Sequence, residues 1–137
     1  MDSYHGSCLC GSVSYRIEGE ESTFYHCHCQ RCRKLSGAGH GSNIRVKNPR
    51  IQWLQGESLI RSYKVPEAAR FRNDFCANCG APVPRHVPSL AMAVIPAGSL
   101  DHEPPIKPQA RIFWKSRAQW SCRDELPVFE EYVETDD

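Results

Sequence analysis

Apolar residues alternate with polar ones at a spacing of two in several short stretches of the chain. Val13, Tyr15 and Ile17 form the first of these stretches. In an extended strand this spacing puts the apolar side chains on one face, where a core can bury them. We therefore predict short strands around residues 13–17, 44–46, 51–53 and 71–75.

Two continuous apolar runs indicate further strands. Leu90 to Ile95 is apolar throughout and ends at Pro96, which suits a strand covered on both faces. Ile112-Phe113-Trp114 is a shorter run of the same kind.

Helices should be few, because ten prolines and nine glycines interrupt the chain. We expect only one or two turns after Cys29 and a short acidic helix from Leu126 to Val133. The predicted fold class is mostly β, with short antiparallel strands and very little helix, in a single domain spanning residues 1–137.

The charges of the chain almost balance, with 17 lysines and arginines against 16 aspartates and glutamates. A surface for nucleic acid or anionic membrane requires a strongly basic patch, so neither is an expected partner. No apolar run approaches the roughly 18 residues of a membrane helix. The first residues show neither a basic leader nor an apolar core, so we expect a cytoplasmic protein.

Seven of the eight cysteines fall into three tight clusters, at positions 8 and 10, 27 to 32, and 76 and 79, and the eighth is Cys122. In a reducing cytosol such clusters indicate metal binding rather than disulfides. Nucleobase deaminases, one class of zinc enzyme, are excluded because the chain lacks their H-x-E motif.

Two cysteine pairs form the first candidate site. On a strand, Cys8 and Cys10 would leave the same face with Cα atoms about 6.6 Å apart. They could lean inward to the roughly 3.8 Å that separates two thiolates on one zinc. Cys76 and Cys79 form a C-x-x-C turn, in which Gly80 can take a positive φ and leave backbone N–H groups facing sulfur. A redox role would require a helix after Cys76, but prolines follow.

Four thiolates leave no vacancy for a substrate, so this first site is interpreted as structural. It would tie the N-terminal strand to the middle of the chain. Spacing alone also permits another set, in which one metal is shared by Cys8, Cys10, Cys27 and Cys29.

The middle cluster brings three thiolates, Cys27, Cys29 and Cys32, from six residues. Three protein ligands leave a fourth position for water or substrate, as in a catalytic zinc site. Zinc held by three thiolates is a weaker Lewis acid than zinc held by three histidines, and suits binding of a further thiolate or a carbonyl oxygen. A thiol switch without metal is one alternative. The other is a closed structural site completed by His26, His28 or Cys122.

Basic residues lie within and directly after the middle cluster, and a glycine-rich stretch follows them. Arg31, Arg33 and Lys34 could attract a carboxylate-bearing substrate, or could form a solvated face. The glycine-rich stretch 37–42 would let backbone or ligand pass close to the cysteines. His40 within it is either an acid or base or a surface histidine.

These motifs, in this order, resemble the family of glutathione-dependent formaldehyde-activating enzymes, which includes the centromere protein V domain. Residues 6–15 match its G-x-C-x-C-G-x-V-x-Y start, and residues 27–33 match its C-x-C-x-x-C-R segment. Residues 75–80 match its F-C-x-x-C-G segment. Further matches are Ala97-Gly98-Ser99-Leu100-Asp101, Trp120 and Leu126-Pro127-Val128-Phe129.

The resemblance implies a β-tent fold with two zinc ions per chain. It implies a structural zinc on Cys8, Cys10, Cys76 and Cys79. It implies a catalytic zinc on Cys27, Cys29 and Cys32. The implied partners are a small thiol such as glutathione and a small aldehyde, which the family's name-giving enzyme joins into S-hydroxymethylglutathione.

Two functional hypotheses follow. The first is a zinc-dependent carbon–sulfur lyase of this type. The second is a non-catalytic, zinc-stabilised binding module with the same fold. A nucleic-acid zinc ribbon is disfavoured by the near-neutral charge.

Overall fold

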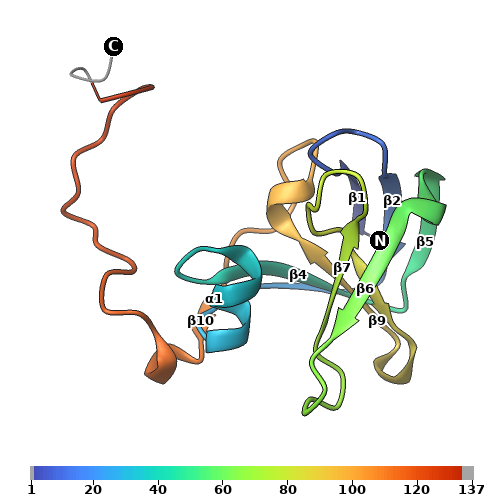
Figure 1. Cartoon of the computed structure of the whole chain (residues 1–137), viewed down its shortest axis with the longest axis horizontal. Coiled ribbons are helices and arrows are strands. Elements are labelled where there is room, and N and C mark those ends of the chain that lie inside the picture. The colour runs from blue at the N-terminus through green and yellow to red at the C-terminus, as the bar shows by residue number, and fades with distance from the viewer. Residues whose placement is uncertain (1, 134–137) are drawn as a thin grey trace.

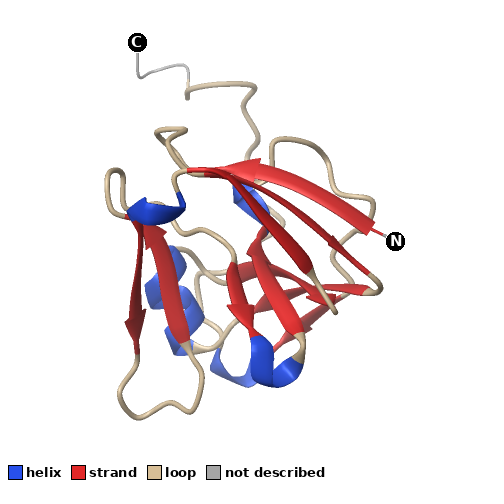
Figure 2. Cartoon of the chain, turned by 90° about the vertical axis from the view of Figure 1, so that its right-hand side faces the viewer, coloured by secondary structure: helices blue, strands red, loops and turns tan. Residues whose placement is uncertain are grey.

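The computed structural model describes residues 2–133 and shows a body built mainly of short strands (Figure 1). Those residues contain ten strands, one α-helix and four short 3₁₀ helices. The strands are β1 (Asp2–Ser7), β2 (Ser14–Gly19), β3 (Ser22–Cys27), β4 (Gly41–Lys47), β5 (Arg50–Gln55), β6 (Ile60–Lys64), β7 (Arg72–Cys76), β8 (Arg85–Val87), β9 (Met92–Pro96) and β10 (Ala110–Ile112). The helices are α1 (Gln30–Ser36), η1 (Glu57–Leu59), η2 (Pro88–Leu90), η3 (Ala97–Ser99) and η4 (Trp114–Ser116). The mostly-β prediction is confirmed, and Figure 2 shows the helical turns lying in the connections between strands.

The strands form three sheets. The first has the order β1-β2-β5, the second β10-β3-β4-β9-β8, and the third is the hairpin β6-β7. Within the described chain every named pair is antiparallel except β10, which runs parallel to β3. The antiparallel prediction therefore holds for all pairs but one.

The main core lies where the first two sheets face each other. Its side chains follow the predicted alternation: in β2, Tyr15 and Ile17 are buried, while Arg16 between them and Glu18 after them are only partly covered. Burial of such apolar side chains stabilises the fold by roughly 25 cal/mol per Å² of apolar surface. The core cluster consists of Tyr4, Tyr15, Ile17, Phe24, Ile44, Val46, Ala93 and Ile95.

A second, smaller core joins the β6-β7 hairpin to the loop after β1. Its buried members are Cys8, Val13, Cys76 and Val83. Two of these four are cysteines, so this part of the fold has little purely apolar material. It also places the first and third cysteine clusters side by side.

Three of the predicted elements differ from the structure. Leu126 to Val133 forms no helix: these residues are exposed, and no neighbouring element buries an apolar face of the segment. The run that begins at Leu90 becomes a strand only at Met92, because η2 and a left-handed Ala91 precede it.

Ile112-Phe113-Trp114 is a strand only as far as Ile112, since Phe113 has a φ of 54° and η4 follows. Strands β3, β6 and β8 were not predicted, and the N-terminal strand expected at Cys8 and Cys10 lies earlier, at β1. In β6, for example, four of the five residues are exposed, so the sequence shows no alternation.

Candidate metal centres

The first centre brings together Cys8, Cys10, Cys76 and Cys79, which we call the quartet. All four Sγ atoms lie within 4.8 Å of one another. The Sγ atoms of Cys8 and Cys10 are 3.7 Å apart, and those of Cys10 and Cys76 are 4.0 Å apart. These separations fit a tetrahedral thiolate site, in which sulfurs lie roughly 3.8 Å apart. The structure thus pairs 8 and 10 with 76 and 79, and not with 27 and 29.

The quartet's first pair lies in a turn, not on a strand as the sequence suggested. β1 ends at Ser7, where its pairing with β2 stops, and the chain then turns at residues 8–13. Gly11 has a φ of 81°, and the Val13 amide donates to the Cys8 sulfur at 3.2 Å. The turn therefore gives a backbone donor to the sulfur while still bringing the two cysteines together.

The second pair forms the predicted turn at the end of β7. Gly80 has a φ of 77°, and its amide donates to the Cys76 carbonyl at 2.7 Å. The backbone amide of Asn78 donates to the Cys76 sulfur at 3.3 Å, and its side-chain amide donates to the Cys10 sulfur at 3.2 Å. Residues 77–84 contain no helix, which agrees with a metal-binding turn and not with a redox motif.

Hydrogen bonds favour the thiolate form of two quartet cysteines. Hydrogen bonds lower the pKa of Cys10 to about 5. The Ser12 hydroxyl has the largest effect, and the Asn78 side-chain amide and the Ser12 backbone have smaller ones. The backbone amide of Ala81 is the main group that lowers the pKa of Cys79. Thiolates are the form that binds metal, so this donor set could hold a metal ion.

The second centre contains Cys27, Cys29 and Cys32, which we call the trio. Their Sγ atoms also lie within 4.8 Å of one another. Cys27 ends β3, and Cys29 is the N-cap of α1, where its sulfur accepts from the Cys32 amide at 3.3 Å. Gly37 ends α1 with a φ of 71°, so the predicted helical turns after Cys29 are confirmed.

None of the three expected candidates for a fourth ligand joins the trio. His26, His28 and Cys122 belong to neither group of mutually close ligand atoms within residues 2–133. The ring of His26 stacks on that of His40 with 4.0 Å between centroids. His28 is fully buried edge-on against Trp114, and Cys122 is exposed. The trio therefore offers three sulfur ligands.

Burial has a stronger effect on the thiols of the trio. It raises the pKa of Cys27 and the pKa of Cys32. Burial also acts to raise the pKa of Cys29, but hydrogen bonds, first of all from the Cys32 backbone, outweigh it and leave that pKa lowered. Burial lowers the pKa of His26 and of His28, so it favours neutral imidazoles beside the trio.

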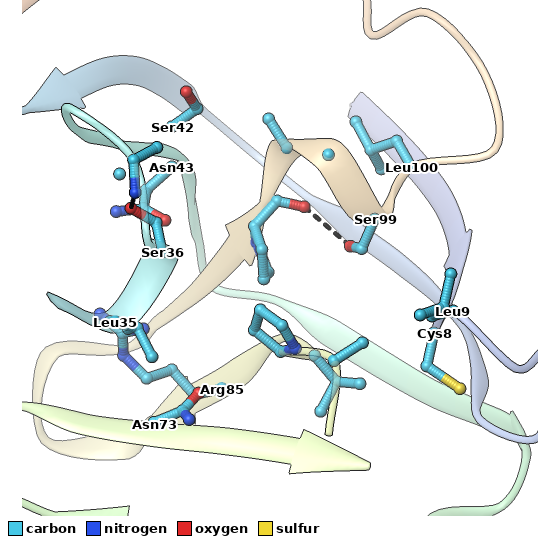
Figure 3. Close-up of a pocket in the computed structure, with 18 of the residues that line it drawn as sticks. Cys8, Leu9, Leu35, Ser36, Ser42, Asn43, Asn73, Arg85, Ser99 and Leu100 are labelled. Atoms are coloured by element: carbon cyan, nitrogen blue, oxygen red, sulfur yellow. Dashed lines mark hydrogen bonds between the residues drawn. The ribbon is translucent and has the colours of Figure 1, made fainter. Parts of the chain in front are cut away.

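A cavity of about 530 Å³ is lined by one cysteine of each centre, Cys8 of the quartet and Cys32 of the trio. Figure 3 shows Cys8 on the opposite side of this cavity from Leu35 and Asn73. The glycine-rich loop forms part of its lining, and a Cβ atom at Gly41 would lie 3.3 Å from the Cβ of Cys32. The loop thus passes as close to the trio as expected. Its apolar lining includes Leu9, Leu35, Pro82, Val83, Pro96 and Leu100, and its polar lining includes Ser36, His40, Ser42, Asn43, Asn73, Arg85, Ser99 and Asp101.

The basic residues within and directly after the trio in sequence are absent from this lining. Arg31 and Lys34 point into solvent from α1, and Arg33 does not reach the cavity. His40, in contrast, lines the cavity, and its Nδ1 lies 3.2 Å from the Ser42 hydroxyl. The cationic side chain that the sequence did not reveal is Arg85, which comes from β8.

No helix in the described residues has the length and apolar character to cross a membrane; the longest, α1, has seven residues.

Comparisons with known proteins identify a solved structure with a similar fold and a family model that matches most of the chain. A crystal structure of a Rhodobacter sphaeroides protein is similar, with a TM-score of 0.54 and 20% sequence identity, over 78% of this chain and 98% of that chain. At this identity the similarity concerns the fold. No curated protein matches the chain. The family model of the glutathione-dependent formaldehyde-activating enzyme matches residues 3–116, a span that contains both cysteine centres. The chain therefore belongs to the family of glutathione-dependent formaldehyde-activating enzymes.

Proposed function

We propose that this protein is a zinc-dependent carbon–sulfur lyase that joins a small thiol, such as glutathione, to a small aldehyde, such as formaldehyde. Family membership supports the type of reaction. The two cysteine centres support the cofactor, because sets of close sulfur donors suit zinc.

The two centres have different roles in this proposal. Zinc at the quartet (Cys8, Cys10, Cys76 and Cys79) is structural, and zinc at the trio (Cys27, Cys29 and Cys32) is catalytic. One observation carries the assignment: the trio has only three protein ligands among the described residues, and Cys32 lies in the wall of the cavity. A substrate in that cavity can approach the position that the protein leaves free.

Zinc at the trio would supply a Lewis-acid position suited to a thiolate or a carbonyl oxygen. In the overall reaction a carbon–sulfur bond forms, the carbonyl π electrons move to oxygen, and the thiol proton ends on that oxygen. His40 is the imidazole in the cavity lining. Because its Nδ1 is engaged by Ser42, Nε2 is the nitrogen left to carry the proton.

The test combines a metal count with a rate measurement. Native mass spectrometry of the wild-type protein should give two zinc ions per chain. Exchange NMR should show faster interconversion of formaldehyde, glutathione and their adduct than buffer alone, since the adduct also forms without an enzyme.

Cys29→Ser is the matched variant, because serine is itself a good N-cap and should preserve α1. It should retain one zinc, remain folded and lose the acceleration. Full turnover in Cys29→Ser would contradict the proposal.

A binding module is the second candidate, favoured by the exposed segment 122–133, which runs away from the sheets (Figure 1). Val128 and Tyr132 in this segment are 91% and 82% exposed, and Trp120 just before it is 65% exposed. A binding module would still capture a protein partner after mutation of the trio. Its cobalt-substituted form would show no saturable spectral response to thiols or aldehydes.

A further inference from the structure

Among residues 2–133, Arg85 is the one lysine or arginine in the lining of the cavity that Cys8 and Cys32 share. β8 carries this residue and places it opposite Val94 of β9, at the edge of the five-stranded sheet. In Figure 3 the Arg85 side chain extends towards Leu35 of α1, on the same side of the cavity as Asn43 and Asn73.

Arg85 is only partly exposed, yet its guanidinium has no hydrogen-bond or ion-pair partner within residues 2–133. The Cζ atom lies 5.5 Å from the centroid of the Phe71 ring, which covers the guanidinium without accepting its protons as a carboxylate would. The nearby Asp74 is already paired with Arg72 at 2.9 Å. A guanidinium has five N–H donors, and removing them from water is costly unless a partner replaces the water.

Charge and burial act on Arg85 in opposite directions. Burial lowers the pKa of its guanidinium, while negative charge on Cys32 and on Asp74 raises it. Arginine remains charged in proteins, so the cavity presents a partly desolvated positive charge near the trio.

Two amide side chains line the cavity on the same side as Arg85. Asn43 comes from β4 and Asn73 from β7, and neither amide has a side-chain hydrogen bond within the described residues. A planar guanidinium that donates two parallel hydrogen bonds, with amide donors beside it, is the chemistry that binds a carboxylate. A neutral ligand would leave the guanidinium unpaired.

We propose that Arg85, with Asn43 and Asn73, forms a carboxylate-binding subsite, and that the thiol substrate carries a carboxylate at this position. The second half of this statement rests on the proposed function, whereas carboxylate binding by the cavity does not. An alternative role for Arg85 is to offset the negative charge of the trio, and the experiment must separate the two.

The test uses two ligands of similar length, 3-(methylthio)propanoate and 3-(methylthio)propan-1-ol, with the zinc-loaded protein at low ionic strength. Neither has a thiol proton to lose, so their binding does not depend on turnover. Isothermal titration should show that wild-type protein binds the carboxylate about ten- to a hundredfold more tightly than the alcohol, the range typical of a charged hydrogen-bonded pair. Arg85→Gln should remove this preference.

Arg31→Gln is the matched control, because Arg31 lies beside the trio in sequence but points into solvent. It should keep the preference and two zinc ions per chain. A second measurement needs no variant: the NMR signal of the Arg85 Nε–H group should shift on addition of the carboxylate and not of the alcohol.

Three results would overturn the proposal. The first is wild-type protein that binds the carboxylate no better than the alcohol. The second is an equal loss of preference in Arg31→Gln and Arg85→Gln. That result would mean that the carboxylate is attracted by the overall positive charge of this region and not by a specific subsite. The third is loss of the trio's zinc in Arg85→Gln, which would make Arg85 a charge partner of the metal centre. A failure of the proposed function appears separately, as absent thiol–aldehyde turnover with the carboxylate preference intact.

Discussion

The quartet and the trio use the same ligand type but are built in different ways. In the quartet, Cys10 and Cys76 are 66 positions apart in sequence and their sulfurs are 4.0 Å apart. The trio comes from six consecutive residues at the junction of β3 and α1. A metal at the quartet therefore joins distant parts of the chain, while a metal at the trio holds only a local loop.

The surroundings of the two centres sharpen this difference. The quartet lies in the small core, where Cys8 and Cys76 account for two of the four buried residues. The trio lies beyond the end of β3 in the large sheet, whose core is formed by other, apolar side chains. Loss of metal should therefore cost folding energy at the quartet and reactivity at the trio.

The largest expected effect follows from breaking the quartet with Cys76→Ser. The free energy of zinc binding in small zinc domains is about 10 kcal/mol or more, comparable to the whole stability of a domain, about 5–15 kcal/mol. Cys76 is fully buried in the small core, so a serine at this position would bury a hydroxyl group that is a poorer zinc ligand than a thiolate. We expect the variant to be largely unfolded at 25 °C, as measured by circular dichroism and size-exclusion chromatography.

Cys29→Ser provides the comparison for that measurement, since it should melt within a few degrees of wild type. Equal melting temperatures for the two variants would contradict the assignment of a structural role to the quartet alone. Two zinc ions in Cys76→Ser would contradict it as well.

Much of both centres could be predicted from the sequence, because their ligands lie in short motifs. The C-x-x-C turn constrains Cys76 and Cys79 whatever the rest of the fold does, and Gly80 takes the positive φ that the turn needs. The three sulfurs of the trio converge within one loop and one helical turn. The spacing of residues in a short motif is therefore enough to predict which sulfurs converge when the motif alone determines their positions.

The cavity could not be predicted in the same way. Its Arg85, Asn43 and Asn73 come from three strands that pair only after the chain has folded, and no motif joins them. The basic residues nearest the trio in sequence, such as Arg31, were more conspicuous but point into solvent.

The false helix at Leu126 to Val133 has a related cause. Its residues have an apolar pattern, but no neighbouring element covers the segment. Without tertiary packing a short helix is unstable in water.

A smaller effect, confined to the trio's side of the comparison, is expected from His40→Asn. The residue lines the cavity but belongs to neither set of sulfur ligands. If His40 carries the proton, the rate should fall about a hundredfold, the lower range for acid–base catalysis. Two zinc ions per chain should remain, as counted by native mass spectrometry.

His86→Asn is the control for this variant, because His86 is exposed on β8 and outside the cavity. It should leave the rate unchanged. An unaltered rate in His40→Asn would remove His40 from the proposed reaction while leaving the assignment of the metal centres intact.

The smallest expected effect comes from Cys122→Ser, and it bears directly on the number of ligands at the trio. Cys122 is exposed and has a φ of 58°, and its sulfur is not among the mutually close sulfurs of either centre. The variant should keep two zinc ions, the wild-type melting temperature and full turnover. Because a fourth protein ligand would occupy the position that the proposed reaction needs, loss of one zinc in Cys122→Ser would turn the trio into a second closed site and make both centres structural.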